Sequence, residues 1–248
     1  QADAAEFALA VSPPRFELRA KPSEPIREVI EVTNAAAQAG TFRIQTADWD
    51  FLPDASVLFR DGLEPGSCRP WVAIERRELT VLPGQSYRFR FEVTPPPGQA
   101  PVECRFAILL EGQEQSAKAG ALAIPLAGRM GVIVYVAVGD VAPQLSVTGS
   151  SVIRINGQAT PVLQVNNSGT AHGRLGGFLS GTDASGQRLE FSPAGTQILP
   201  GETRAVTLSA SRPGTPDTAV TPKYPVVVRG RLEWGDGHST DLAQRFME

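Results

Sequence analysis

The chain has 248 residues, of which 42% are hydrophobic and 20% are charged, and its net charge is −3. This composition excludes a disordered chain, and the slightly negative charge gives no basic footprint for nucleic acid. No apolar run approaches the ~20 residues that cross a bilayer, so the sequence predicts no transmembrane segment. The 24 Gly and 21 Pro fall between short apolar runs, which is typical of an all-β protein with many turns.

The first half of the chain is predicted to form a series of short strands. Pro13-Pro14 divides the first apolar stretch into segments 7–11 and 16–19. Alternation of apolar and polar residues then indicates half-buried strands, because successive side chains of a strand point to opposite faces. These strands cover residues 26–34, 41–49, 71–74, 78–81, 86–93 and 105–110.

The segment 130–138 (MGVIVYVAV) is apolar on both faces. Val132, Val134 and Val136 share one face of the predicted strand, and Ile133 and Tyr135 share the other. Because a sandwich strand normally buries one face only, this strand needs a second cover. An incoming strand of another protein, paired to its edge, would provide one. The alternative is a strand held between the core of the first domain and the second domain.

A second set of strands is predicted after Asp140, and no segment keeps a helical period. Two sets of about seven short strands indicate two tandem immunoglobulin-like β-sandwich domains, over residues 1–140 and 141–248. Two short internal matches suggest a duplication: VLPG at 81–84 recurs as ILPG at 198–201, and EVTN at 31–34 recurs as QVNN at 164–167. The predicted strands of the second half cover 144–148, 151–155, 161–165, 174–180, 187–191, 204–209, 224–234 and 242–246.

Cys68 and Cys104 are the only cysteines, and they belong to no metal-binding spacing. Both lie at the edges of predicted strands in the first domain, so we expect a disulfide, worth up to ~4 kcal/mol. The alternative is two buried free thiols. The opening QADA is small and polar, as is usual after a signal-peptide cleavage site. Together with the cysteines it predicts an exported protein whose signal peptide has been removed.

Few residues suggest chemistry. Four aspartates between residues 48 and 61 could offer oxygen ligands to calcium, but their spacing differs from the EF-hand template. His172 and His238 are the only histidines and stand alone, and no catalytic motif is present. Trp49, Trp71 and Trp234 could form a carbohydrate platform or lie in the core. We therefore expect no metal site, no cofactor and no enzymatic activity.

Several strings resemble the PapD-like periplasmic chaperones, which serve pilus and fimbrial assembly. In the first half these are VSPPRFEL, IEVTNAA, TADWD and RPWVAIERRELTVLPGQ. In the second half VLQVNNSGTAHGRLGGFLSGTDASGQRL and ILPGETRAVTL resemble the second domain of the non-classical branch. The resemblance implies a periplasmic chaperone with pilin-like subunits as clients and an outer-membrane usher as a further partner.

The resemblance also implies the client-binding residues. In that family a basic pair anchors the terminal carboxylate of the client, and a strand that ends the first domain completes the open sandwich of the client. Arg15 stands at the position of the first basic residue, whereas Gly139-Asp140-Val141 replaces the second. The implied client-binding set is Arg15, Val132, Ile133, Val134, Tyr135 and Val136. The alternative function is a structural or adhesive exported protein, without enzymatic activity, whose sandwiches act as spacers or bind glycan.

Overall fold

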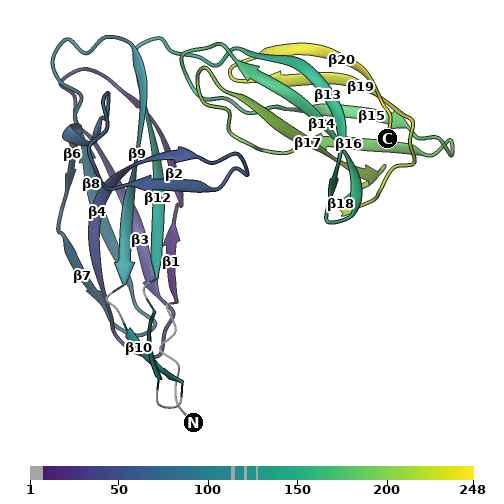
Figure 1. Ribbon diagram of the computed structural model, residues 1–248. Helices are drawn as coiled ribbons and strands as arrows, with labels where there is room; N and C mark the ends of the chain where they lie inside the picture. Colours follow the sequence, from purple (N-terminus) through teal and green to yellow (C-terminus); the bar gives the residue numbers. More distant parts are fainter. Residues whose placement is uncertain (1–7, 113–114, 120–121, 127) are drawn as a thin grey trace. The chain divides into compact units, whose positions relative to one another are not determined.

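The computed structural model describes residues 8–112, 115–119, 122–126 and 128–248 (Figure 1). Within these residues every regular element is a β-strand, apart from one 3-10 turn, η1 (Arg69–Trp71). No helix in the described part is long and apolar enough to cross a membrane. The chain divides into two compact units, Gln1–Asp140 and Val141–Glu248. The predicted all-β class is confirmed.

The first unit is built from two main sheets. One has the strand order β1-β3-β8-β6, and the other has the order β2-β12-β9-β4-β5, with β7 paired to β4. A hairpin of β10 and β11 pairs only with itself within the described residues. The strands are β1 (Leu9–Ser12), β2 (Arg15–Ala20), β3 (Ile26–Asn34), β4 (Gly40–Phe51), β5 (Val57–Arg60), β6 (Val72–Ile74), β7 (Glu78–Val81), β8 (Ser86–Val93), β9 (Val102–Gly112), β10 (Gln115–Ala119), β11 (Leu122–Leu126) and β12 (Arg129–Val138).

The chain passes from one sheet to the other at Pro13 and Pro14. Before them β1 pairs antiparallel with β3, and after them β2 pairs parallel with β12. Proline has no N–H to donate to a ladder, so two in succession end one pairing and allow the next to begin. The core of the unit lies between the two sheets. Its fully buried side chains include Ile30, Val32, Phe89, Phe91, Phe106, Ile108 and Val134.

The second unit is a single sheet that turns back on itself. Its order is β13-β14-β17-β16-β15-β19-β20, with β18 paired to β17. One end of β16 pairs with β15 and the other end pairs with β17, which lets the sheet enclose a core of its own. The strands are β13 (Leu145–Ile155), β14 (Gln158–Asn167), β15 (Gly176–Thr182), β16 (Arg188–Pro193), β17 (Thr203–Arg212), β18 (Thr215–Ala219), β19 (Val226–Trp234) and β20 (His238–Phe246).

A buried asparagine ends β3 in the first unit, and another asparagine ends β14 in the second unit in the same way. Asn34 Nδ2 donates to the carbonyls of Gln38 (2.8 Å) and Val81 (2.9 Å), and its Oδ1 accepts from the amide of Ala36 (3.0 Å). We call this set of bonds the asparagine clamp. It ties the end of the strand to the start of the VLPG turn.

Asn167 repeats these three bonds and adds a fourth, in which its Oδ1 accepts from the amide of Gln144 (3.1 Å). Its Nδ2 donates to the carbonyls of Ala171 (2.8 Å) and Ile198 (2.9 Å), and its Oδ1 accepts from the amide of Gly169 (2.9 Å). Ile198 begins the ILPG turn, as Val81 begins VLPG. The two short sequence matches therefore mark one structural device that is present in both units.

The structure adds strands that the sequence analysis did not predict: β5, β10, β11 and β18. It also joins the predicted segments 144–148 and 151–155 into one strand, β13, with an irregularity between Val147 and Gly149. β10 (QSAKA) and β18 (TPDTA) have few apolar residues, and β5 (VLFR) and β11 (LAIPL) are short apolar runs without alternation. The irregularity in β13 shifts the alternation of its second half. Phe7, the predicted start of the first strand, lies outside the described residues.

Candidate functional site

β12 has one edge that is only partly covered. It pairs with β9 along its whole length, from Arg129 to Val138, but β2 covers its other edge only from Ile133 onward. In the described part of the chain no strand pairs with that edge over residues 129–132, which we call the open segment. The sequence analysis offered the whole segment 130–138 as a donor strand, with burial against the second domain as the alternative. The structure places β2 along the edge of its second half. The reason is the chain crossing at Pro13-Pro14, which delivers β2 to the second half of β12.

The valine face of β12 belongs to the core of the first unit. Val132, Val134 and Val136 are fully buried there. Met130, on the same face within the open segment, is half-buried and packs against the end of this core. A strand added beside the open segment would therefore extend a core that is already formed.

The opposite face of β12 has a cover within the first unit. Tyr135 is 2% exposed, and its ring meets the indole of Trp49 edge to face, with 5.5 Å between centroids. Trp49 also contacts Phe51 (5.0 Å) and carries the guanidinium of Arg105 over its ring (5.3 Å). Burial is the main cause that raises the pKa of Tyr135, so its hydroxyl stays protonated. The second cover that the sequence required at Tyr135 thus includes residues of β4 and β9.

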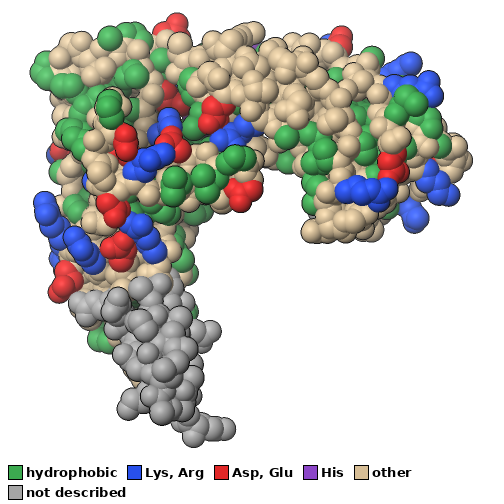
Figure 2. All heavy atoms as spheres, in the orientation of Figure 1, with side chains coloured by type: hydrophobic (Ala, Val, Ile, Leu, Met, Phe, Trp, Pro, Cys, Tyr) green, Lys and Arg blue, Asp and Glu red, His purple; other side chains and the backbone are tan. Residues whose placement is uncertain are grey.

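The β4–β5 hairpin closes the outer face of the open segment (Figure 1). A Cβ atom at Gly131 would collide with the ring of Phe59, so a larger residue here would force this ring to move. Arg129 stacks over the same ring at 5.6 Å and forms ion pairs with Asp61 (2.6 Å) and Glu111 (2.7 Å). Figure 2 shows basic and acidic side chains interspersed on this side of the first unit. On the open segment, the strand edge and the face that carries Met130 remain available for contact with a partner strand.

Arg15 marks the point where the open segment ends. It is the first residue of β2 and lies opposite Ile133 in the register. Its side chain is 38% exposed, and its Nε lies 3.3 Å from Glu17 Oε1. The structure therefore places this predicted site residue beside the edge that could receive a partner strand.

The disulfide between Cys68 and Cys104 is present, which confirms the prediction and leaves no free cysteine. Arg69, next in the chain, ties the same loop to β4: it donates to the carbonyls of Thr46 (2.7 Å) and Gly62 (2.9 Å) and pairs with Asp48 (3.3 Å). The sequence analysis gave Arg69 no role. The RPW string in which it stands was the available signal, but its partners come from loops whose path the sequence does not define.

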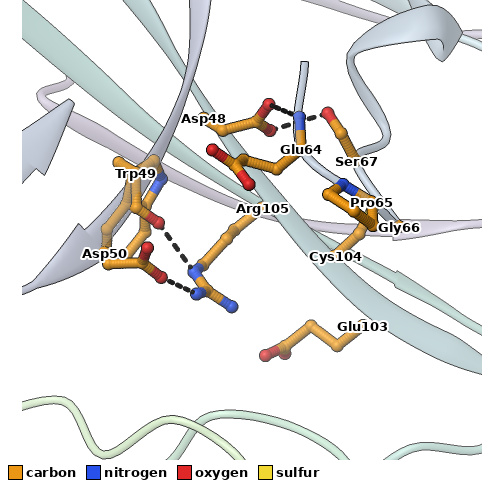
Figure 3. A pocket seen from close by; sticks show the side chains of 10 residues that line it. All are labelled: Asp48, Trp49, Asp50, Glu64, Pro65, Gly66, Ser67, Glu103, Cys104 and Arg105. Atoms are coloured by element: carbon orange, nitrogen blue, oxygen red, sulfur yellow. Dashed lines mark hydrogen bonds and ion pairs between the residues drawn. The ribbon is translucent and has the colours of Figure 1, made fainter. Parts of the chain in front are cut away.

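A hollow of about 300 Å³ lies where this loop meets β4 and β9 (Figure 3). Asp48 accepts there from Ser67 Oγ (2.6 Å) and from the amide of Glu64 (3.0 Å). Arg105 donates to the carbonyl of Trp49 (3.2 Å) and to Asp50 (2.6 Å). These bonds give Asp48 and Arg105 structural roles, in holding the loop and the hairpin to the sheet.

Asp50 is also held by Arg60 of β5 (3.0 Å). Burial alone would raise the pKa of the Asp50 carboxyl, but the hydrogen bonds from Arg60 and Arg105 outweigh it and hold the pKa below its ordinary value. Asp54 accepts from Ser56, and Asp61 pairs with Arg129. The four aspartates that suggested calcium thus have separate partners. Among the described residues no group of three or more His, Cys, Asp or Glu is arranged to hold a metal ion.

The three tryptophans do not form one exposed platform. Trp49 is 2% exposed and Trp234 is 8% exposed, and they belong to different units. Trp71 follows Pro70 in η1 and packs, half-buried, against the core of the first unit. Their burial favours the core interpretation over the carbohydrate platform.

No protein-family model matches the chain, and no curated protein matches it either. A solved structure shares its fold. A chain from the chaperone–tip adhesin complex of CFA/I fimbriae biogenesis has a TM-score of 0.50 and 13% identity, over 96% of this chain and 98% of that chain.

Two further solved structures are similar over nearly their whole length. The class 5 fimbriae chaperone CfaA has a TM-score of 0.49 and 13% identity, over 97% of this chain and 99% of that chain. A structure of Salmonella enterica SafA pilin with the SafB chaperone has a TM-score of 0.48 and 12% identity, over 96% of this chain and 97% of that chain. The likeness to the CFA/I complex shows that this chain has the fold of the PapD-like fimbrial chaperones, as its sequence predicted.

Proposed function

We propose that this protein is a periplasmic chaperone that binds pilin-like subunits at the open segment of β12. The observation that carries the proposal is the half-covered edge. Within the described residues β12 is paired on both sides over Ile133–Val138 and on one side over residues 129–132. Unpaired backbone groups on such an edge are a template for a strand from another chain. The fold is shared with a chain of a chaperone–tip adhesin complex, which supports a fimbrial subunit as the client.

The position of Arg15 suggests the direction of the client strand. A strand that runs parallel to β12 along the open segment reaches β2 with its C-terminal end and cannot continue past it. Its terminal carboxylate would then lie beside the Arg15 guanidinium, a geometry suited to a charge-assisted hydrogen bond. Arg15 forms an ion pair with Glu17, an exposed neighbour on the same strand, so a carboxylate ligand would compete with this partner. We therefore keep Arg15 as the client anchor implied by the resemblance.

The Met130 face supplies the apolar part of the proposed contact. Met130 is half-buried at the end of the core, and burying one large apolar side chain contributes roughly 1.5–3 kcal/mol. Ile133, Val134, Tyr135 and Val136 have both strand edges occupied, so their role in the proposal is to hold the strand in place. They would contact the client directly only if β2 moved away from β12.

The periplasmic location rests on the disulfide, since disulfides persist in oxidising compartments. In the proposed route the chaperone then passes its client to an outer-membrane usher. The mechanism of the proposal is binding and release, with no catalytic step.

The test is co-purification from the periplasm of a producing strain, with bound proteins identified by mass spectrometry. We expect a pilin-like subunit to travel with the chain. Arg15→Ala should weaken its binding about 10- to 100-fold, the size expected for a hydrogen bond between charged groups. Arg19→Ala, on the same strand but beside the covered part of β12, is the matched control. Recovery of no fimbrial subunit, or equal loss in the two arginine variants, would overturn the proposal.

A second pair of variants tests the apolar face. Met130→Asp places a charge beside the open segment, whereas Ile74→Asp places one on the edge strand β6, where a similar half-buried residue also packs on the core. If clients add at the open segment, only Met130→Asp should lose the subunit at equal thermal stability. Loss in both variants, or in neither, would place the client elsewhere.

A further inference from the structure

Phe178 on β15 has the most exposed large apolar side chain among the described residues, at 92%. It lies inside a sheet, because β19 pairs with β15 along its whole length and β16 pairs with it from Leu179 onward. An aromatic side chain in a sheet normally packs against its cross-strand neighbours. A bare aromatic ring on a sheet face is typical of a protein interface.

The ring is bare because the residues around it on the same face are small. Side chains of a strand alternate between the two faces, so Gly176 and Ser180 are the strand neighbours that share the face of Phe178. On the side of β16 the ladder with β15 ends at Phe191, and the next residue of that strand is Ser192. None of these neighbours can cover an aromatic ring, so the cover has to come from another molecule.

Two charges of opposite sign stand on either side of β15. Ser180 lies opposite Glu190 of β16 in one ladder and opposite Arg229 of β19 in the other. All three are exposed and are preceded in the chain by buried residues, so they share one outer face. Arg231 forms an ion pair with Asp241 (3.5 Å). Among the described residues no ion pair engages Arg229 or Glu190.

A two-fold axis parallel to β15 makes this face complementary to itself. Rotation about such an axis lays β15 of one copy over β15 of another and exchanges the two sides, so that β16 of each copy faces β19 of the other. Phe178 then meets Phe178 of the second copy, and Arg229 of each copy faces Glu190 of the other. Sheets pack face to face about 10 Å apart and within about 30° of parallel. Aromatic rings and long charged side chains can span this separation.

We propose that the protein forms a homodimer through the outer face of β16, β15 and β19, with Phe178 at its centre and an ion pair between Arg229 and Glu190 on each side. The charges favour a second copy as the occupant, because a face that meets its own copy must carry both signs at positions that the two-fold axis superposes. A face with charges of one sign would repel itself. The site lies wholly within the second unit and does not depend on the function proposed above.

The size of the face indicates a weak dimer. Three strands about 4.8 Å apart and seven residues of about 3.4 Å each cover roughly 350 Å². A standard interface buries about 800 Å² on each partner. We therefore expect an equilibrium between monomer and dimer that depends on concentration.

Sedimentation equilibrium of the full chain, up to about 1 mM, tests the central contact. We expect the wild type to dimerise with rising concentration. Phe178→Ser should raise the dissociation constant about tenfold or more, as is usual for an aromatic residue at the centre of an interface, and should keep the melting temperature. The control is Leu63→Ser, which removes a side chain of the first unit that is 64% exposed. A wild type that stays monomeric, or a Phe178→Ser variant that dimerises equally well, would overturn the proposal.

Charge reversal tests whether the partner is a second copy. Arg229→Glu brings two acidic side chains together at each contact, and Glu190→Arg brings two basic ones together, so each variant alone should be monomeric. An equimolar mixture should dimerise again, because both contacts then join opposite charges. Arg212→Glu, at the exposed end of β17, is the control and should dimerise like the wild type. Single variants that dimerise as tightly as the wild type, or a mixture that stays monomeric, would contradict the two-fold contact.

Discussion

The two units share the asparagine clamp but close their sheets in different ways. Asn34 and Asn167 make the same three side-chain bonds to equivalent positions. In each clamp the turn ends on a glycine with positive φ, Gly84 at 66° and Gly201 at 78°, a conformation that favours glycine. The clamp is therefore a requirement of the fold that both units meet, and it carries no information on their roles.

The differences lie at the strand edges. The first unit covers the outer face of β12 with the β4–β5 hairpin and fastens a loop to β9 with a disulfide. Within the described residues it leaves residues 129–132 of β12 unpaired on one edge. The second unit has no cysteine, and in the described chain its sheet order ends in β13 and β20, which each pair with a single strand. A strand edge offers backbone groups that the interior of a sheet does not. The comparison makes predictions that differ between the units.

The largest expected effect concerns the disulfide, which only the first unit has. Replacing both Cys68 and Cys104 by Ala should lower the free energy of unfolding of this unit by about 4 kcal/mol, because the bridge closes a long loop. Hydrogen exchange measured on peptides of each unit during urea unfolding checks this. Peptides of residues 141–248 serve as the control and should keep their protection. Equal loss in both units would show that they do not unfold independently and would break the comparison.

Removing the clamp should affect both units alike. Asn34→Ala deletes three side-chain hydrogen bonds and Asn167→Ala deletes four, because Asn167 Oδ1 also accepts from the amide of Gln144 (3.1 Å). At roughly 1 kcal/mol per bond we expect costs of about 3 and about 4 kcal/mol. Each variant should lose stability in its own unit, by the same measurement. Asn166→Ala, next to the second clamp, is the control. A large effect at one asparagine and none at the other would mean that the turn of that unit is held by other contacts.

The sequence predicted what depends on local pattern. Alternation located most of the strands, and the EVTN and VLPG matches located both clamps. The disulfide was predicted from the place of the two cysteines in strand-like segments. What the sequence could not show is which strands lie side by side. The open edge of β12 depends on where β2 joins it, and the cover of Tyr135 depends on Trp49, which is distant in the chain. The valine face could not be distinguished from the Ile133 face, because a one-residue change in register exchanges them.

A smaller effect of the opposite sign is expected inside the second unit. Gln197 is 7% exposed, and neither its Nε2 nor its Oε1 has a hydrogen-bond partner. Gln197→Leu replaces the amide by an apolar group of similar size and should raise the stability of this unit by about 1–2 kcal/mol. Thermal unfolding measures the change, with the exposed Gln158→Leu as control. A loss of stability would show that the amide is satisfied by buried water.

The smallest expected effect is on the stability of each unit in acid. It depends on two carboxyl groups with a lowered pKa, Asp50 in the first unit and Asp183 in the second. Burial raises both pKa values, but donors outweigh it: Arg60 and Arg105 at Asp50, and Ser185 with the amides of Lys223 and Gln187 at Asp183. A carboxyl whose folded-state pKa lies below its ordinary value of 3.8 stabilises the fold above that value, and the contribution is lost as the pH falls through the folded-state pKa.

High salt should affect the stability contributions of Asp50 and Asp183 differently. The donors of Asp50 are charged arginines at a partly exposed site, so 1 M salt, where the Debye length is about 3 Å, should screen much of their effect. The donors of Asp183 are neutral N–H and O–H groups around a buried carboxylate, which salt does not screen. Acid unfolding at low and high salt, followed by hydrogen exchange in each unit, should show that salt reduces the contribution of Asp50 and leaves that of Asp183. Asp50→Asn and Asp183→Asn identify the two contributions, because each removes one of them. If salt reduced both equally, the low pKa of Asp183 would have to come from charges rather than from its hydrogen bonds.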